Sequence, residues 1–101
     1  MRTLVMFDLP TLTSAEQKQY RIFRKKLIKE GFVMMQYSIY CKLTLNSTQK
    51  DRIERFVESN KPAAGNVAML TITEKQFANI KYVLGQFASD VLTTTDRLVV
   101  I

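Results

Sequence analysis

The sequence predicts an α+β fold whose elements follow the order strand, helix, strand, strand, helix, strand. Runs of β-forming apolar residues occupy residues 2–8, 32–45 and 66–73. The two longer segments between them repeat apolar residues at helical spacing and begin with capping residues. This order is that of the split βαβ unit, so we expect one ferredoxin-like βαββαβ sandwich with an antiparallel sheet over residues 1–101.

The first predicted strand, residues 2–8, is mostly apolar on both faces. Successive side chains of a strand point to opposite faces of the sheet. A strand that is apolar on both faces is typical of the centre of a sheet that is covered on both sides. One face carries Thr3, Val5 and Phe7, and the other carries Leu4, Met6 and Asp8.

The first predicted helix follows a cap at Thr13 or Ser14 and ends near Glu30, before the helix-stopping Gly31. One side of this helix is apolar, and the roughly opposite side is basic. The basic stripe contains no acidic residue between its ends, whereas solvated helix faces usually mix both signs of charge. We expect it to contact nucleic-acid phosphates, with a plain solvated face as the alternative. The apolar stripe consists of Tyr20, Phe23 and Leu27, and the basic stripe of Lys18, Arg21, Lys25 and Lys29.

The remaining segments complete the pattern. Residues 32–45 are long for one strand, so we expect two strands with a tight reversal or bulge near residues 36–38. The later elements are a helix from a cap at residues 46–48 to residue 60, a strand at 66–73, a short helix to about residue 79 that starts with a capping box of Thr73 and Gln76, a loop at 85–96, and an extra C-terminal strand at 97–101.

The sheet face away from the helices also needs a cover. With both helices on one face, apolar residues of the other face would be exposed to water. A second copy of the same sheet is the simplest cover, so we expect a homodimer. The strand at residues 97–101 is free to pair across it, and we expect residues 81–101 to form an extension that contacts the sister subunit or another partner.

The composition restricts the chemistry. The chain has no histidine and one cysteine, which excludes histidine-based catalysis and cysteine-rich zinc sites. Any catalysis must use carboxylates, hydroxyls and cations, and we expect it to use a hard, oxygen-binding ion. The net charge of +6 favours a polyanionic partner, most often a nucleic acid. The single cysteine fits a reducing cytoplasm, and no apolar run is long enough to predict a membrane span.

Asp8, at the end of the first strand, is the main candidate for a functional site. An ionised carboxylate at the end of an apolar strand is costly unless it is hydrogen-bonded, paired or bound to a metal. Two roles are open, namely a cap of the turn before Pro10 that accepts backbone N–H groups, or a metal ligand. Ser38 either binds phosphate or a metal-bound water, or satisfies a bulge. Tyr40 and Cys41 are predicted to pack in the core.

Several stretches, taken in order, resemble one family. They are "MFDLP" at the end of the first strand, the basic helix "KQYRIFRKKLIKEGF", the segment "QYSIY" and the strand-to-helix junction "TITEKQF". Together they resemble the small CRISPR-associated endonucleases, the second core proteins of spacer acquisition. The resemblance extends over residues 1–77. The sequences of the helix and of the "TITEKQF" junction are close to those of members from systems with a single large RNA-guided effector, the type II-like subgroup.

The resemblance implies a ferredoxin-like homodimer that sits between two CRISPR integrase dimers and helps to hold double-stranded prespacer DNA. It also implies metal-dependent cleavage of RNA or double-stranded DNA, an activity that varies between members. The family's metal-associated aspartate maps onto Asp8, for Mg²⁺ or Mn²⁺, and its serine and aromatic residue map onto Ser38 and Tyr40. Two positions depart from the pattern: Met34 stands where some members have a basic residue, which weakens the inference of RNA cleavage, and Phe7 replaces the usual tyrosine.

Three classes of function remain. The first is a metal-dependent phosphodiesterase in which a dimer brings two copies of Asp8 towards one ion. The second is a non-catalytic bridge that holds prespacer DNA between integrase dimers. Both need the strand that ends in Asp8 and the basic helix, so the sequence does not separate them. The third, a regulator that binds a small ligand, is the weakest because the chain has no glycine-rich or pocket signature.

Overall fold

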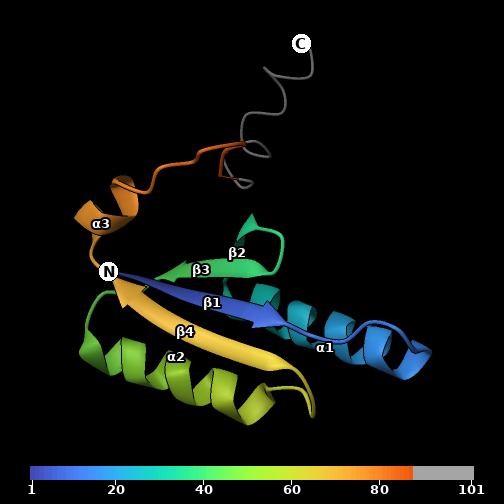
Figure 1. Cartoon of the computed structure of the whole chain (residues 1–101). Coiled ribbons are helices and arrows are strands. Elements are labelled where there is room, and N and C mark those ends of the chain that lie inside the picture. Colours follow the sequence, from blue (N-terminus) through green and yellow to red (C-terminus); the bar gives the residue numbers. More distant parts are fainter. Residues whose placement is uncertain (88–101) are drawn as a thin grey trace.

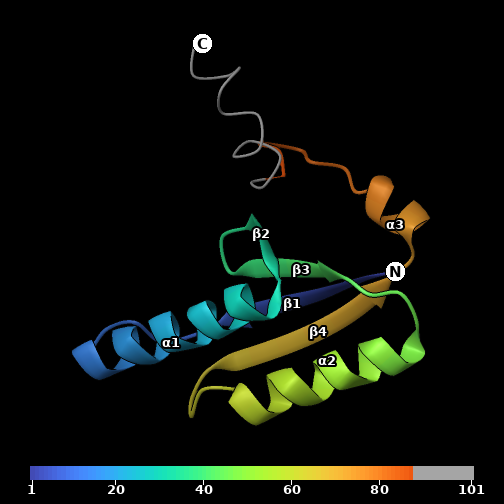
Figure 2. The same cartoon turned by 180° about the vertical axis from the view of Figure 1, so that it is seen from behind.

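The computed structural model describes residues 1–87, so the predicted last strand lies outside the described residues. The elements predicted up to residue 79 are confirmed, and they follow the predicted order (Figure 1, and Figure 2 from behind). No helix among residues 1–87 has the length and apolar character that crossing a bilayer requires. The elements are β1 (Arg2–Asp8), α1 (Ser14–Glu30), β2 (Val33–Gln36), β3 (Ile39–Leu43), α2 (Ser47–Asn60), β4 (Asn66–Ile72) and α3 (Glu74–Ala78).

The strands form one antiparallel sheet in the order β2-β3-β1-β4. β1 pairs with β3 on one side and with β4 on the other, so that Val5 lies opposite both Tyr40 and Met69. This order and these directions are those of the predicted ferredoxin-like sandwich. β1 occupies the central position that its two apolar faces predicted.

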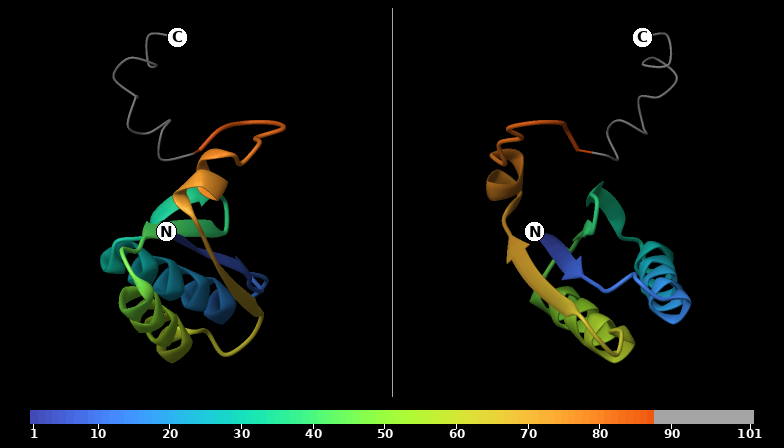
Figure 3. Two further views of the ribbon diagram at one scale, coloured as in Figure 1. Left: turned by 90° about the vertical axis from the view of Figure 1, so that its left-hand side faces the viewer. Right: turned by 45° about the vertical axis from the view of Figure 1, so that its right-hand side comes forward.

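α1 and α2 cover one face of the sheet (Figures 1 and 3). Side chains from both helices meet those of β1 and β3 in the larger of two cores. An ion pair between Glu30 of α1 and Arg52 of α2, at 2.7 Å, joins the two helices at the surface. The core consists of Val5, Phe7, Phe23, Leu27, Phe32, Tyr40, Ile53 and Val57.

Contacts between sequence neighbours set both ends of α1. The Thr13 hydroxyl accepts a hydrogen bond from the Glu16 backbone N–H at 3.1 Å, and the Glu16 carboxylate accepts one from the Thr13 N–H at 2.9 Å. This capping box satisfies two N–H groups that the first turn leaves without partners. At the other end, Gly31 adopts the left-handed conformation with φ 106° and donates its N–H to the Ile28 carbonyl at 3.0 Å. The predicted cap and stop are therefore confirmed.

The chain itself covers part of the opposite sheet face, which the sequence analysis did not foresee. α3 and residues 79–87 lie on the side away from α1 and α2 (Figure 1). Arg2 holds α3 there, because its Nε donates to the Glu74 carboxylate at 3.0 Å and its guanidinium lies 4.4 Å from the centre of the Phe77 ring. The buried members of this second core are Leu4, Met35, Cys41 and Phe87.

The Leu27→Ala substitution should lower the free energy of unfolding by about 2–5 kcal/mol, because Leu27 is fully buried and its truncation leaves a cavity. The next residue, Ile28, is 45% exposed, so Ile28→Ala should cost less than about 1 kcal/mol. Urea unfolding followed by circular dichroism, at one fixed protein concentration, measures both. Equal losses in the two variants would contradict this orientation of α1.

Candidate functional site

Asp8 is the last residue of β1, at the point where the chain leaves the sheet. It lies opposite Asn66 of β4, and its side chain is exposed. Within residues 1–87, no hydrogen bond or ion pair reaches its carboxylate. The turn-capping role, which requires bonds from backbone N–H groups, therefore has no support among the described residues. Exposure to water explains how an apolar strand ends in a carboxylate without a burial cost.

Two loops approach each other closely at the end of β1. The loop between α2 and β4 passes so near that a Cβ atom on Gly65 would lie 2.7 Å from the Asp8 carbonyl oxygen and 2.8 Å from Leu9 Cδ2. Gly65 also has φ 102°, a conformation that L side chains rarely adopt. Glycine at this position therefore permits the approach that holds the backbone of Asp8 in place.

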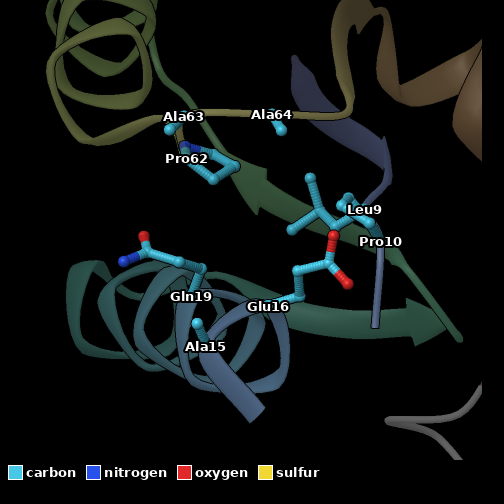
Figure 4. A pocket seen from close by; sticks show the side chains of 8 residues that line it. All are labelled: Leu9, Pro10, Ala15, Glu16, Gln19, Pro62, Ala63 and Ala64. Atoms are coloured by element: carbon cyan, nitrogen blue, oxygen red, sulfur yellow. The ribbon is translucent and has the colours of Figure 1, made fainter. Parts of the chain in front are cut away.

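A small pocket of about 150 Å³ adjoins this loop contact at the start of α1. Figure 4 shows Glu16 and Gln19 rising from α1 towards the loop residues. The Glu16 carboxylate accepts hydrogen bonds from the Leu12 and Thr13 N–H groups at 3.0 and 2.9 Å, both to Oε1, so its position in the pocket is set by the cap of α1. The lining residues are Leu9, Pro10, Ala15, Glu16, Gln19, Pro62, Ala63 and Ala64.

The turn between β2 and β3 lies beside the end of β1 (Figure 1). The Phe7 N–H donates to the Ser38 carbonyl at 3.1 Å, which puts Ser38 and Asp8 at the same end of the sheet. Ser38 has φ 64°, and the strand register shifts between Met34 and Gln36 just before it. The predicted reversal near residues 36–38 is thus confirmed as a bulge followed by a left-handed residue.

Aromatic rings connect this turn to the core. Tyr37 stacks on Tyr20 with ring centroids 6.2 Å apart, and Tyr20 lies 5.9 Å from Phe7. Burial raises the pKa of the Tyr20 hydroxyl, and a hydrogen bond with Tyr37 adds to the rise, while a hydrogen bond with Ser38 opposes it. Among residues 1–87, no contact joins the Ser38 hydroxyl to Asp8.

Tyr40 is a core residue, as predicted, and it also holds a cation of α1. Its side chain is 1% exposed, and its hydroxyl accepts a hydrogen bond from Arg24 Nε at 2.8 Å. This bond satisfies the one polar atom of the buried ring.

Sequence reasoning missed two features of this region. It missed Arg24 because this residue lies outside the predicted basic stripe. It missed the pair of Tyr20 and Tyr37 because Tyr20 was assigned to the core stripe alone. The tyrosine in the "QY" directly before Ser38 was the signal in the sequence that could have indicated this aromatic pair.

The predicted basic stripe is exposed on the outer side of α1. The ion pairs found within residues 1–87 lie elsewhere and use Arg2, Lys50, Arg52 and the N-terminus. The positive charges of the stripe are therefore not compensated by acidic side chains of the described part of the chain, and they attract anions. The stripe consists of Lys18, Arg21, Lys25 and Lys29.

One chain supplies only part of a metal site at Asp8. Among the described residues, no three histidine, cysteine, aspartate or glutamate side chains gather to hold an ion. Mg²⁺ is usually held through one or two carboxylates, with waters and substrate phosphates completing its octahedral shell. The exposed, uncontacted carboxylate of Asp8 fits this pattern as a single protein ligand, and the other ligands must come from water, phosphate or a second copy.

Comparisons with known proteins agree on one family. Residues 1–80 match the family described as CRISPR associated protein Cas2. The CRISPR-associated endoribonuclease Cas2 of Treponema denticola is 48% identical over 101 residues, which cover all of both chains. The protein of the same name from Ligilactobacillus salivarius is 41% identical over the same length and coverage. That from Streptococcus mutans is 44% identical over 99 residues, 98% of this chain and 91% of the relative. β1, the β2–β3 turn and α1 all lie in the matched range, and the chain belongs to the CRISPR-associated Cas2 family.

Proposed function

We propose that the chain is a CRISPR adaptation protein that binds double-stranded prespacer DNA in complex with the CRISPR integrase, and that it is also a metal-dependent endonuclease acting at Asp8. One observation carries the proposal: β1 ends in a carboxylate that no side chain or backbone group of residues 1–87 contacts, and α1 presents a basic face that no acidic side chain of the same residues compensates. The carboxylate suits metal-assisted hydrolysis, and the basic face suits phosphate binding.

The DNA-holding part of the proposal rests on α1. Its basic stripe spans most of the helix from Lys18 to Lys29 and is exposed throughout. Lysine and arginine side chains of this kind bind phosphates and position DNA without reading its sequence. Such binding suits a protein that must accept prespacers of any sequence.

The cleavage part of the proposal rests on Asp8 with Mg²⁺ or Mn²⁺. When bound, the ion supplies a hydroxide nucleophile and stabilises charge on the phosphate. Asp8 would hold the ion, and Ser38, whose carbonyl bonds to Phe7 at the same end of the sheet, would contact phosphate or a metal-bound water. The substrate is RNA or DNA; the relatives named endoribonucleases favour RNA, and the basic face of α1 favours a duplex.

A homodimer would complete both surfaces. Val33, Leu43 and Leu70, on the sheet face away from α1 and α2, are 43%, 47% and 52% exposed. These apolar side chains give a second sheet a surface to pack on. Two subunits would bring two copies of Asp8 towards one ion and present two α1 faces to one duplex. Integrase dimers would flank this pair, and either the sister subunit or the integrase would contact the extension at residues 81–101.

A purely architectural bridge is the second candidate. The observation that favours it is the single carboxylate at the site, since the described residues hold no cluster of acidic or other metal-binding side chains. Phe7 also brings no hydroxyl to the end of β1. In this alternative, α1 and the dimer hold prespacer DNA between integrase dimers, and Asp8 plays no part in acquisition.

The Asp8→Asn substitution should reduce metal-dependent phosphodiester cleavage by about 100-fold or more, because it removes the ionised ligand of an ion that contributes several kcal/mol to the transition state. Duplex affinity should stay the same or rise slightly, because one negative charge is lost. Cleavage of labelled RNA and duplex DNA at several Mg²⁺ and Mn²⁺ concentrations measures the first effect, and fluorescence anisotropy measures the second. Cleavage that persists in Asp8→Asn would contradict the assignment of Asp8.

Spacer acquisition in cells that carry Asp8→Asn separates the two candidate functions. Normal acquisition would support the architectural bridge, and lost acquisition with intact integrase binding would support a role for cleavage.

Replacing Lys18, Arg21 and Lys25 together by alanine should weaken binding to every duplex sequence alike. Each lost phosphate contact makes the slope of log K against log salt shallower by about 0.9, so the slope should change by up to about three units per engaged subunit. Titrations of duplex DNA at several salt concentrations measure the slope.

A matched control removes the same number of charges elsewhere. Lys61, Lys75 and Lys81 are exposed, lie outside α1 and have no ion-pair partner within residues 1–87. Their joint replacement by alanine should leave the salt slope close to that of the wild type. If the two triple variants behave alike, α1 is an ordinary solvated face and the DNA lies elsewhere.

A further inference from the structure

We propose that the exposed ring of Tyr37, supported from behind by Tyr20, is a stacking platform for an unpaired nucleobase. The inference rests on the proposed nucleic-acid binding and extends it, because it assigns a site for a base where α1 offers sites only for phosphates. Stacking on an aromatic side chain tolerates any sequence, since every base has a π-face. The ligand is therefore a single strand or the unpaired end of a duplex.

The geometry of Tyr37 leaves room for a base. Its side chain is 76% exposed, although it stacks on Tyr20 with an interplanar angle of 26° and a centroid separation of 6.2 Å. One side of the ring is thus occupied by Tyr20, and the high exposure of Tyr37 leaves the other side open. A base that stacks there would add a third ring to this near-parallel pair.

The support behind Tyr37 is continuous with the core. Tyr20 is half-buried and lies against Phe7, which itself packs on Phe23 and Tyr40 at centroid distances of 5.2 and 5.7 Å. The backbone bond from Phe7 to Ser38 fixes the turn that carries Tyr37. A platform that is already ordered before binding loses little conformational entropy when a ligand arrives.

The surroundings of Tyr37 suit a nucleic-acid strand. Tyr20 belongs to α1, and Arg24 lies one turn further along the same side of this helix. Asp8 ends β1, and the β2–β3 turn that carries Tyr37 lies at the same end of the sheet. A strand whose base stacks on Tyr37 would therefore lie at the end of the sheet that carries the candidate metal ligand.

A structural role does not explain the position of Tyr37. Tyr40, in the same short segment, is 1% exposed and fills the core, whereas Tyr37 leaves most of its ring in water. Single exposed apolar side chains are common and need no explanation, as for Leu12, which is 93% exposed. Tyr37 differs from these because a second ring is packed behind it.

The test compares two probes of equal length, a short single strand that contains 2-aminopurine and a blunt duplex. Tyr37→Ala should weaken binding of the single strand by about 5- to 150-fold, which corresponds to about 1–3 kcal/mol for one stacked base. Binding of the blunt duplex should not change. Tyr37→Phe keeps the ring and should bind both probes as the wild type does. The 2-aminopurine emission, which stacking quenches, should fall with the wild type and Tyr37→Phe but not with Tyr37→Ala.

Leu45→Ala serves as the control, because Leu45 is 73% exposed and follows β3 at the end of the sheet away from the β2–β3 turn. It should leave both affinities unchanged. If Tyr37→Ala binds the single strand as tightly as the wild type, the platform is overturned while the proposed function stands. Loss of single-strand binding in both Tyr37→Ala and Tyr37→Phe would assign the contact to the hydroxyl and would also overturn it. Failure of the wild type to bind either probe would overturn the proposed function together with the platform.

Discussion

The central position of β1 is the constraint on which the rest of the structure depends. The strand is hydrogen-bonded to β3 and β4 on its two edges, and its alternate side chains enter two different cores. Val5 packs under α1 and α2, and Leu4 packs under the segment that follows β4. A slip of one residue would exchange these faces, so the register is strongly specified. The same register determines where Asp8 leaves the sheet and meets water.

The elements could be predicted because the signals that define them are local. Thr13, Glu16 and Gly31 set the ends of α1 through contacts with residues a few positions away, and Thr73 and Gln76 do the same for α3. The two apolar faces of residues 2–8 predicted a central strand for a similar reason, since alternation along one strand shows how many sides are covered. The family resemblance rested on these same segments in order, and the match over residues 1–80 confirmed it.

Contacts between distant parts of the chain could not be predicted in the same way. The stacking of Tyr20 on Tyr37 depends on the bulge near Gln36 and on the bond between Phe7 and Ser38, which bring a turn next to a helix. The bond from Arg24 to Tyr40 requires the same alignment of α1 over β3. The second core depends on how the chain continues beyond β4, where residues 80–87 carry no periodic pattern. Sequence spacing identifies candidates at such places, and three-dimensional packing decides their partners.

The distribution of charge gives the candidate site its character. Most acidic side chains of residues 1–87 are already engaged, in the cap of α1 or in ion pairs with Arg2, Lys50 and Arg52. None of these pairs uses a cation of the basic stripe, so within residues 1–87 the positive charges of the stripe stay uncompensated. A duplex drawn to that field would be held by many weak phosphate contacts. Within residues 1–87, Asp8 and Glu58 are left without such a partner. Of the two, Asp8 lies at the end of the central strand, where a metal ion would offset its repulsion of an approaching phosphate. Holding nucleic acid and cutting it therefore depend on opposite charges on separate elements, so one property can be lost while the other remains.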